Sequence, residues 1–421
     1  MITNLNYMDY ISVMDLHRYP KKCLINKKMI RQSISNGILT FQEVELGIIS
    51  LEVYDENIKL IPYVNPNLKY NLNVECKDAY TSSYLDIDIL YLGCFWNCWG
   101  HFFTDGLAKA WYLLTDEYNK KYKGKVKIAI SFINNALQSC PKPLLSLYQL
   151  LGVDESDIIV ITQPMKFRSV IVPDNSLFFH NGTRHFTKEY TDTIETITNA
   201  VPANQDKKYE KIYLSRTRFT KGNADFGERS LVSVFKRLGY TIIHPQEYSV
   251  LEQISIFKAT KSFVSTTGSL GHNSVFCNRN TEIILLRKCW ATFDYQLVIN
   301  EAKDLNVTYV DTHLTCFVND QPNNGPFYLY RNSNFCRFIN DRFDLTVRED
   351  FSTKRYMRYM RICLMRPDMK CRTQAHNYYF NKLREELQND SWKRKVVGVL
   401  NSWLPKLIIK YINNLYYKIY R

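Results

Sequence analysis

Residues 240–276 have the sequence YTIIHPQEYSVLEQISIFKATKSFVSTTGSLGHNSVF, and this stretch decides the fold. A short apolar run that ends in His244-Pro245 precedes an amphipathic stretch, and a second apolar run at 262–266 leads into a turn with two glycines. Apolar runs of strand length that alternate with helical patterns predict βαβ units and a parallel sheet. The stretch is therefore predicted as strand, helix, strand, turn and helix.

The same alternation continues on both sides of this stretch. KIYLS (211–215) and TEIILL (281–286) have the length and composition of strands, and ERSLVSVFKRLG (228–239) has the period of an amphipathic helix. An earlier run of the pattern precedes the polar segment 199–210. Its expected elements are strands at 85–93, 125–132 and 157–161, a helix around 143–152, and one continuous helix through GHFFTDGLAKAWYLL (100–114).

The predicted class is α/β, with two doubly wound, Rossmann-like domains. Alternating runs at 41–54 and 58–64 predict strands of an N-terminal β layer. The expected layout is an N-terminal β-rich extension (1–75), a first Rossmann-like domain (76–205), a second one (206–330) and a basic helical C-terminal region (331–421), with a hinge near 200–210. Open sheets bind ligands at the carboxyl ends of their strands, so the side chains for chemistry are expected in the turns there.

The positive charge of the chain is concentrated at one end. The formal net charge of the 421 residues is +14, and residues 354–421 alone hold sixteen Lys or Arg against four acidic residues. A basic tail on a nearly neutral body indicates that the tail meets an anionic surface. A nucleic-acid-binding protein, which needs basic residues across a folded face, is the alternative of another class.

Composition also indicates a compartment. The eleven cysteines are scattered, and an odd number cannot all pair within one chain. The first residues lack the pattern of a secretory signal, and no stretch approaches the roughly 20 apolar residues that span a bilayer. We therefore expect reduced cysteines and a cytoplasmic location, with chance sequons at Asn181, Asn306 and Asn389.

Two turns of the second domain suit an anion. Arg216 and Arg218 follow the strand 211–215, and arginine offers forked, permanently charged donors to phosphate oxygens. The turn after 262–266 supplies Gly268, Ser269, His272 and Asn273, where glycine lets backbone amides approach a ligand. The alternatives are a solvated arginine pair and a turn that only connects two elements.

One pair in the first domain suits acid-base chemistry. His101 and Asp105 lie four residues apart on the predicted helix 100–114 and so share a face. Asp105 can take a proton from an attacking hydroxyl, while His101 orients that hydroxyl or meets a phosphate. The alternative is an acid that complements the helix dipole, beside a histidine that is hydrogen-bonded in the core.

Three further patterns have residue types that can bind a ligand. Asp86-Ile87-Asp88 is a DxD sequence, but its aspartates alternate within a predicted strand. Cys94, Cys98 and His101 have helical spacing without a clear fourth ligand, so no metal is expected. His244-Pro245 is interpreted as a turn at a strand end that can touch a ligand.

Taken in order, the segments between about 90 and 290 resemble glycosyltransferase family 61. WGHFFTDGLAKAW (99–111) is similar to the family's first motif, a His followed four residues later by an acid, and KIYLSRTR (211–218) is similar to its strand that ends in Ser-Arg. The stretch 240–276 follows its long final block. The chain departs from the family in having Gly227-Glu228 for an Asn-Glu pair and Thr267 for a His, and in placing Asn97 one residue farther from His101.

The resemblance implies a GT-B-like architecture, with two facing Rossmann-like domains. The donor nucleotide would lie on the second domain, with Glu228 added to its binding residues, and the acceptor and the base Asp105 on the first. It implies inversion at the anomeric carbon without an essential metal or other cofactor. We expect an inverting transfer from a UDP-sugar to a glycan of a capsule or surface polysaccharide; the alternative is a non-catalytic sugar-nucleotide-binding or scaffold protein.

The C-terminal residues 391–421 contain no acidic residue. Six apolar residues fall near helical spacing on one side: Trp392, Val396, Val399, Leu400, Trp403 and Leu407. Basic and aromatic residues flank them, as in helices that lie in a membrane interface. We expect this segment to hold the protein at the inner face of the plasma membrane, beside a lipid-linked glycan acceptor; the alternative is a helix that packs on the first domain.

Overall fold

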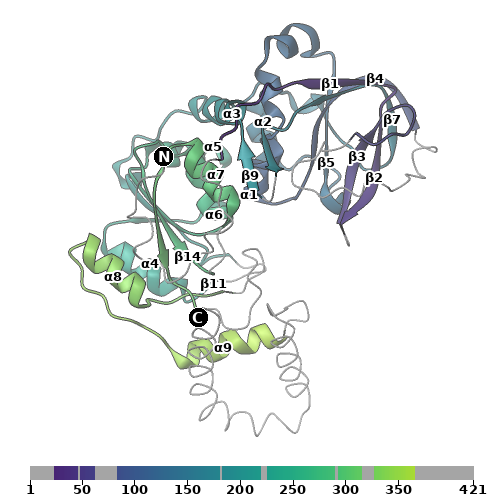
Figure 1. The fold of residues 1–421 in the computed structure, drawn as a ribbon. Coiled ribbons are helices and arrows are strands. Elements are labelled where there is room, and N and C mark those ends of the chain that lie inside the picture. The colour runs from purple at the N-terminus through teal and green to yellow at the C-terminus, as the bar shows by residue number, and fades with distance from the viewer. Residues whose placement is uncertain are drawn as a thin grey trace, which may run out of the picture.

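The computed structural model describes residues 23–45, 48–61, 83–180, 183–219, 225–289, 293–314 and 327–365. These residues form two α/β parts, each built around one large sheet (Figure 1). The tail predicted to bind membrane, 391–421, lies outside the described residues. In the part of the chain that is described, no helix combines the length and the apolar character needed to cross a bilayer.

The first sheet has seven strands in the order β3-β2-β7-β4-β5-β6, with β1 also paired to β7. They are β1 (Arg31–Ser35), β2 (Ile38–Glu45), β3 (Ile48–Tyr54), β4 (Ser83–Phe95), β5 (Lys127–Phe132), β6 (Ile158–Val160) and β7 (Met165–Pro173). The strands β4 to β6 and β7 run parallel, whereas β1 and β2 meet β7 in antiparallel pairs. The strands of the N-terminal β-rich extension therefore complete the first sheet.

The continuous helix expected at 100–114 is wrong. The chain forms α1 (Trp99–Phe102) and then two 3-10 turns, Asp105–Leu107 and Ala110–Leu114. Three carbonyl groups that a helix would use internally accept hydrogen bonds from distant residues. Tyr190 Oη donates to Phe103 at 2.9 Å, Tyr148 Oη to Gly106 at 2.9 Å and Ser176 Oγ to Ala108 at 2.7 Å. Tertiary hydrogen bonds replace helical ones here, and aromatic side chains pack on several sides of the segment.

A hairpin and two helices surround α1. The hairpin consists of β8 (Leu177–His180) and β9 (Thr183–Phe186), and the helices are α2 (Lys142–Gln149) and α3 (Lys188–Asn199). After α3 the chain crosses to the second sheet through the expected hinge region. Lys258 Nζ donates to the carbonyl oxygens of Thr198 at 3.0 Å and Val201 at 2.9 Å, which ties this crossing to the second part.

The second sheet is entirely parallel, in the order β12-β10-β13-β14-β15. Its strands are β10 (Lys211–Leu214), β12 (Thr241–Ile243), β13 (Ser262–Thr266), β14 (Glu282–Arg287) and β15 (Asn306–Asp311). Its helices are α4 (Glu228–Arg237), α5 (Val250–Ala259), α6 (Ser269–His272) and α7 (Asp294–Ala302). The strands and helices expected between 211 and 286 are confirmed, and the order of the sheet reverses at β10, where such sheets bind ligands.

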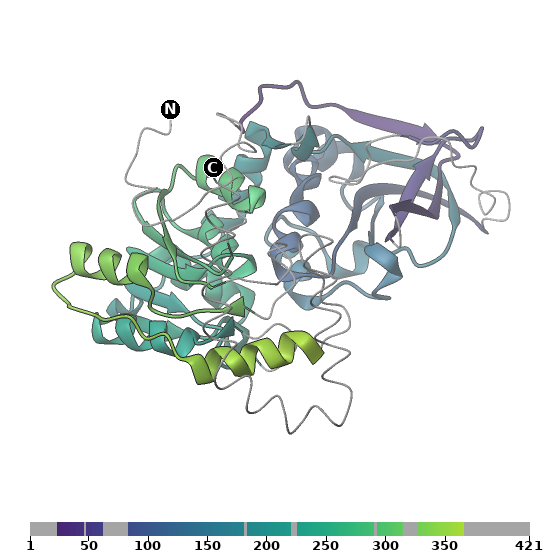
Figure 2. The same ribbon diagram turned by 60° about the horizontal axis from the view of Figure 1, so that its bottom comes forward.

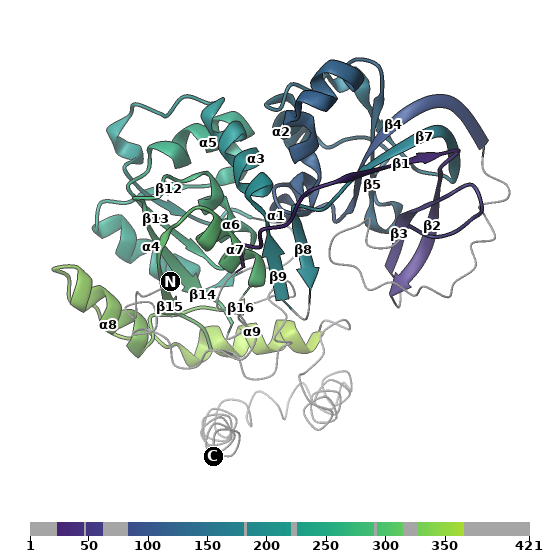
Figure 3. The same cartoon turned by 45° about the horizontal axis from the view of Figure 1, so that its top comes forward.

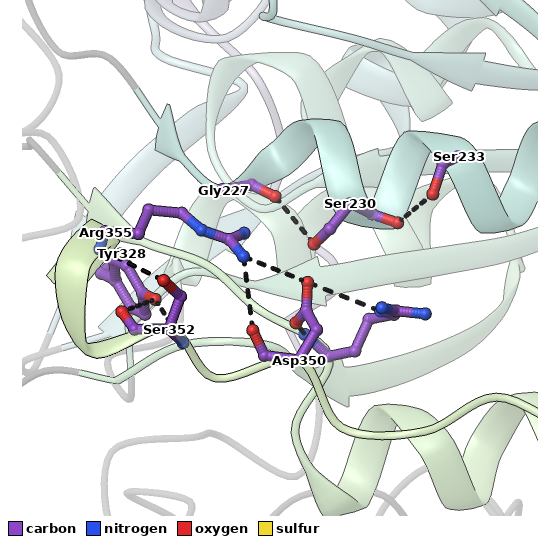
Figure 4. A network of polar contacts seen from close by, with 8 residues as sticks. Gly227, Ser230, Ser233, Tyr328, Asp350, Ser352 and Arg355 are labelled. Atoms are coloured by element: carbon purple, nitrogen blue, oxygen red, sulfur yellow. Dashed lines mark hydrogen bonds and ion pairs between the residues drawn. The ribbon is translucent and has the colours of Figure 1, made fainter.

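The described residues beyond β15 pack against the turn at Gly227 in the second part. The strand β16 (Phe327–Tyr328) pairs with β11 (Asp225–Phe226), and α8 (Ser333–Arg342) and α9 (Thr353–Met365) follow. Figure 4 shows Asp350 and Arg355 next to the Gly227 turn, with Arg355 Nη2 3.5 Å from Asp350 Oδ2. Gly227 has φ of +87°, and a Cβ there would lie 1.9 Å from the carbonyl oxygen of Leu329. Only glycine fits this position without a shift of the backbone.

The two parts share one apolar core. Residues of both sheets belong to the same buried cluster, and the rings of Phe103 and Phe276 meet edge to face at 5.5 Å between centroids. The helix α1 of the first part packs directly on α6 of the second (Figure 3), and Trp99 Nε1 donates to Asn273 Oδ1 at 2.8 Å. Figure 2 shows the two parts side by side, with α9, the yellow-green helix, below the second sheet. The region around α1 and α6 is therefore the interface of the two parts, and it also lies at the carboxyl edge of the second sheet.

Candidate active site

A carboxylate lies buried at the interface of the two parts. Asp105 is 4% exposed, and its Oδ2 lies 2.6 Å from Nδ1 of His101. The hydroxyl of Tyr295, which comes from α7 of the second part, donates to Asp105 Oδ1 at 2.5 Å. Both carboxylate oxygens are thus engaged, one by each part. The His101–Asp105 pair predicted from the sequence is brought together although its helix is broken.

Arg184 of β9 completes this group. Its guanidinium carbon lies 3.5 Å from the ring centroid of Tyr295, and its Nε lies 2.9 Å from Asp294 Oδ2. Burial alone would raise the pKa of Asp105, but the charge and hydrogen bond of His101, together with Arg184 and Tyr295, lower it below its usual value. Asp105 is therefore held ionised in a buried site.

His101 is the more accessible member of the pair. Its side chain is 21% exposed, against 5% for that of Asp105. The bond to Asp105 uses Nδ1, so Nε2 is the ring nitrogen that remains for another partner. A carboxylate that fixes one ring nitrogen orients the imidazole and makes the other nitrogen a better proton acceptor.

His272 of α6 faces the same interface. It is 5% exposed, and within the described residues neither ring nitrogen has a hydrogen-bond partner. Burial, followed by the charges of His101, Lys288 and Arg184, lowers its pKa to about 3. The imidazole is therefore neutral at physiological pH, with one donor and one acceptor nitrogen. A Cβ at Gly100 of α1 would lie 3.0 Å from Nδ1, which shows how closely the two parts approach.

Arg216 lies at the carboxyl end of β10, as predicted. Its backbone amide donates to both oxygens of Glu228, at 3.0 and 3.2 Å, and its Nε lies 3.7 Å from Asp225 Oδ2. Glu228 is 1% exposed, and burial, followed by the charge of Asp225, raises its pKa to about 7. Glu228 therefore shapes the Arg216 turn from inside, rather than standing open to a ligand.

The other predicted anion-binding residues are arranged differently. Arg218 is 65% exposed in its side chain and pairs with Glu247 at 2.7 Å, away from Arg216. Ser269 Oγ lies 3.7 Å from Cys98 Sγ of the first part, in line with the contact that Asn273 makes to Trp99. These two side chains thus contact α1, while Gly268 has φ of +105° at the bend between β13 and α6.

Residues 99–284 match the model of the family Glycosyltransferase 61. The matched segment contains the His101–Asp105 pair, the Arg216 turn and α6. The match and the parallel sheets are compatible with a Rossmann-like glycosyltransferase fold. A search of curated proteins found no match to the chain.

The residues of the two possible metal-binding patterns, Asp86-Ile87-Asp88 and Cys94-Cys98-His101, make contacts within the protein. Arg168 Nε donates to Asp88 Oδ1 at 2.8 Å, and the same side chain lies 3.5 Å from Asp86. Cys94 is buried, and burial raises the pKa of its thiol to about 12. Within the described ranges, no group of three or more His, Cys, Asp or Glu is arranged to hold a metal ion.

His244 remains at its predicted strand end, and its Nδ1 lies 3.3 Å from the carbonyl oxygen of Ser215. It thus belongs to the same edge as Arg216. Its pKa is lowered by burial and then by Arg218.

Three residues of the site were missed from the sequence: Arg184, Tyr295 and Lys288. Lys288 had a usable signal, because it comes two residues after the predicted strand 281–286, near a strand end like Arg216 after 211–215. Arg184 lies in a short hairpin and Tyr295 in the first turn of α7, where no spacing rule marks them. Their place in the site depends on how the two parts pack.

Proposed function

We propose that the protein is an inverting glycosyltransferase that moves a sugar from a nucleotide diphosphate sugar, a UDP-sugar, to a hydroxyl of a glycan. One observation carries the proposal: the His101–Asp105 pair of the first part is joined by Tyr295 to the second part, whose sheet edge carries Arg216. A proton acceptor and a phosphate-binding edge that meet at the interface of two α/β parts suit a GT-B arrangement. The family match supports the same class.

In the proposed reaction the pair acts as a unit, with His101 in contact with the acceptor. In its neutral form, with Nδ1–H donating to Asp105, His101 takes the proton of the acceptor hydroxyl on Nε2 while the hydroxyl oxygen bonds to the anomeric carbon. The bond from that carbon to the diphosphate oxygen breaks, and its electron pair leaves with the diphosphate. Attack from the opposite face inverts the configuration. Asp105 stays ionised and stabilises the imidazolium that forms. The sequence-based expectation has Asp105 as the base; the greater exposure of His101 supports His101 in that role.

The leaving diphosphate would meet Arg216 and the backbone around Gly268 at the carboxyl edge of the second sheet. Charge on the departing oxygens is then stabilised by fixed protein groups, which is worth several kcal/mol in a site shielded from water. As the resemblance implies, the proposed reaction needs no essential metal. His272, as a neutral imidazole between the two groups of charges, would hydrogen-bond the transferred sugar or the departing oxygen.

The cellular role belongs to the same proposal. We propose that the acceptor is a growing capsule or surface polysaccharide, free or lipid-linked, and that residues 391–421 hold the protein at the inner face of the membrane. The proposal includes no binding of nucleic acid. A non-catalytic sugar-nucleotide-binding protein is the competing function, and it differs in predicting nucleotide binding without turnover.

The test compares nucleotides on three forms of the purified protein. Thermal unfolding would be measured with UDP, GDP, CMP and ADP for wild type, Arg216→Ala and Arg218→Ala. A ligand that binds only the folded state raises Tm. We expect UDP to raise the Tm of wild type and of Arg218→Ala, whose arginine is exposed, but not that of Arg216→Ala. If none of the four nucleotides shifts the wild type, the nucleotide-sugar proposal fails.

A further inference from the structure

Lys288 is a buried cation to which the proposed reaction gives no role. It follows β14 directly and is 3% exposed. In the described part of the chain its ammonium group has a cation–π contact with the ring of Phe327, 4.6 Å from the centroid, and Nζ donates no hydrogen bond. Burying an ammonium group without hydrogen bonds is costly. A buried ammonium group is expected where a bound ligand pairs with it or where a nearby opposite charge compensates it.

Lys288 has both acidic and basic neighbours at this edge of the second sheet. Asp225 and Glu228 attract its ammonium group, whereas Arg216 repels it. The Asp225 side chain is 0% exposed, and neither of its oxygens has a hydrogen bond within the described residues. The raised pKa of Glu228, about 7, leaves much of that carboxyl uncharged near neutral pH. Arg216 and Lys288 thus have Asp225 as a common acidic neighbour.

Three adjacent strand ends bring this charge together. The strands β10, β13 and β14 are neighbours in the parallel sheet, and Arg216, Gly268 and Lys288 each follow one of them. A Cβ at Gly268 would lie 3.4 Å from Lys288 Nζ and 3.3 Å from a ring carbon of Phe293. The lack of a Cβ at Gly268 therefore lets the backbone of this turn lie close to the ammonium group. The place is the switch point of the sheet, where ligands bind in open α/β folds.

We propose that Lys288 and Arg216 bind the two phosphates of the donor diphosphate from opposite sides, with Asp225 holding both cations in place before the ligand arrives. The proposal rests on the proposed function and adds the residue that recognises the diphosphate. A diphosphate carries at least two negative charges, which match the two cations. The nucleoside itself makes no contact with Lys288 in this arrangement, so uridine and UDP should respond differently to its loss.

The experiment measures binding of UDP, uridine and inorganic pyrophosphate by calorimetry. The proteins are wild type, Lys288→Met, Lys288→Arg and the control Lys303→Met. Lys303 is a buried lysine that pairs with Glu195, and it lies between α7 and β15, away from Arg216. We expect Lys288→Met to weaken UDP and pyrophosphate about tenfold or more and to leave uridine unchanged. Lys288→Arg, which keeps the charge, should retain most of the affinity, and Lys303→Met all of it.

The outcomes separate this inference from the proposed function. If wild type binds UDP, Arg216→Ala loses it and Lys288→Met binds UDP and pyrophosphate as tightly as wild type, the inference is wrong and the proposed function stands. If wild type binds neither UDP nor pyrophosphate, both fail. The unliganded Tm of each variant is measured first. If Lys288→Met does not fold, the test uses Lys288→Arg, which keeps the positive charge. If Lys288→Arg then loses as much pyrophosphate affinity as Arg216→Ala, the charge of Lys288 does not bind the diphosphate and the inference is wrong.

Discussion

The hydroxyl of Tyr295 donates a hydrogen bond of 2.5 Å to Oδ1 of Asp105, across 190 positions of the sequence. Tyr295 lies in α7 of the second part and Asp105 in the turn after α1 of the first, so the bond joins the two parts at the carboxylate. Arg184 stacks on the same tyrosine ring. The electrostatic state of Asp105 therefore depends on the way the two parts are assembled.

We expect Tyr295→Phe to lower kcat about tenfold, since it removes a bond that orients Asp105 and lowers its pKa. With that bond lost, the pKa of Asp105 rises. Because His101 and Asp105 act as a pair, the acidic limb of the pH–kcat profile, which reports protonation of the pair, should move to higher pH. Tyr309→Phe is the matched control, because Tyr309 is also buried and its hydroxyl accepts from Asn300 at 3.1 Å. An acidic limb that stays in place in Tyr295→Phe would remove Tyr295 from the mechanism.

The division of roles within the pair can be tested by two substitutions. We expect His101→Gln and Asp105→Asn each to lower kcat by about 10² to 10⁴, the usual contribution of a general base and its partner. Both variants should still be stabilised by UDP, because the pair lies on the first part and Arg216 on the second. Turnover that survives in His101→Gln but not in Asp105→Asn would show that Asp105 itself takes the proton.

Two glycines with similar backbone conformation offer a matched test of the Gly227 turn. Gly227 and Gly239 have φ of +87° and +81°, but a Cβ at Gly239 would meet no atom within 4 Å. We expect Gly239→Ala to cost about 1 kcal/mol for the left-handed backbone. Gly227→Ala should cost clearly more, about 3 kcal/mol or above, because its Cβ overlaps the Leu329 carbonyl. Equal midpoints of urea unfolding for the two variants would contradict the overlap.

Glu228 should make stability depend on pH near neutrality. Its pKa is raised from 4.5 to about 7 in the folded protein. Between these values the unfolded chain releases the proton while the folded protein keeps it, so the free energy of unfolding falls as pH rises from about 4.5 to 7. Glu228→Gln does not titrate, and its stability relative to wild type should increase over that window, by on the order of 2 kcal/mol. Urea unfolding at pH 5 and pH 8 measures this, and a constant difference would refute it.

The second sheet was well predicted because its strands are short apolar runs separated by amphipathic helices. Such runs are typical of parallel strands buried on both faces. The same rule failed at 100–114, where the pattern is helical but carbonyl groups of Phe103, Gly106 and Ala108 bond to distant side chains and backbone. It also gave no pairing for β1, β2 and β3, since strand partners are chosen by tertiary packing rather than by local composition.

By itself the sequence determined the local part of the site: His101 four residues before Asp105, Arg216 at the end of a strand, and Gly268 at a turn into a helix. These follow from spacing, because neighbours along the chain are also neighbours in space. Only the tertiary structure decided that Tyr295 bonds to Asp105, that Arg184 stacks on Tyr295, and that Lys288 and Arg216 follow the two strands on either side of β13 in the second sheet. Those positions depend on the packing of α1 on α6 and on the order of strands in the second sheet, and both are fixed by burial of apolar surface from residues far apart in the chain.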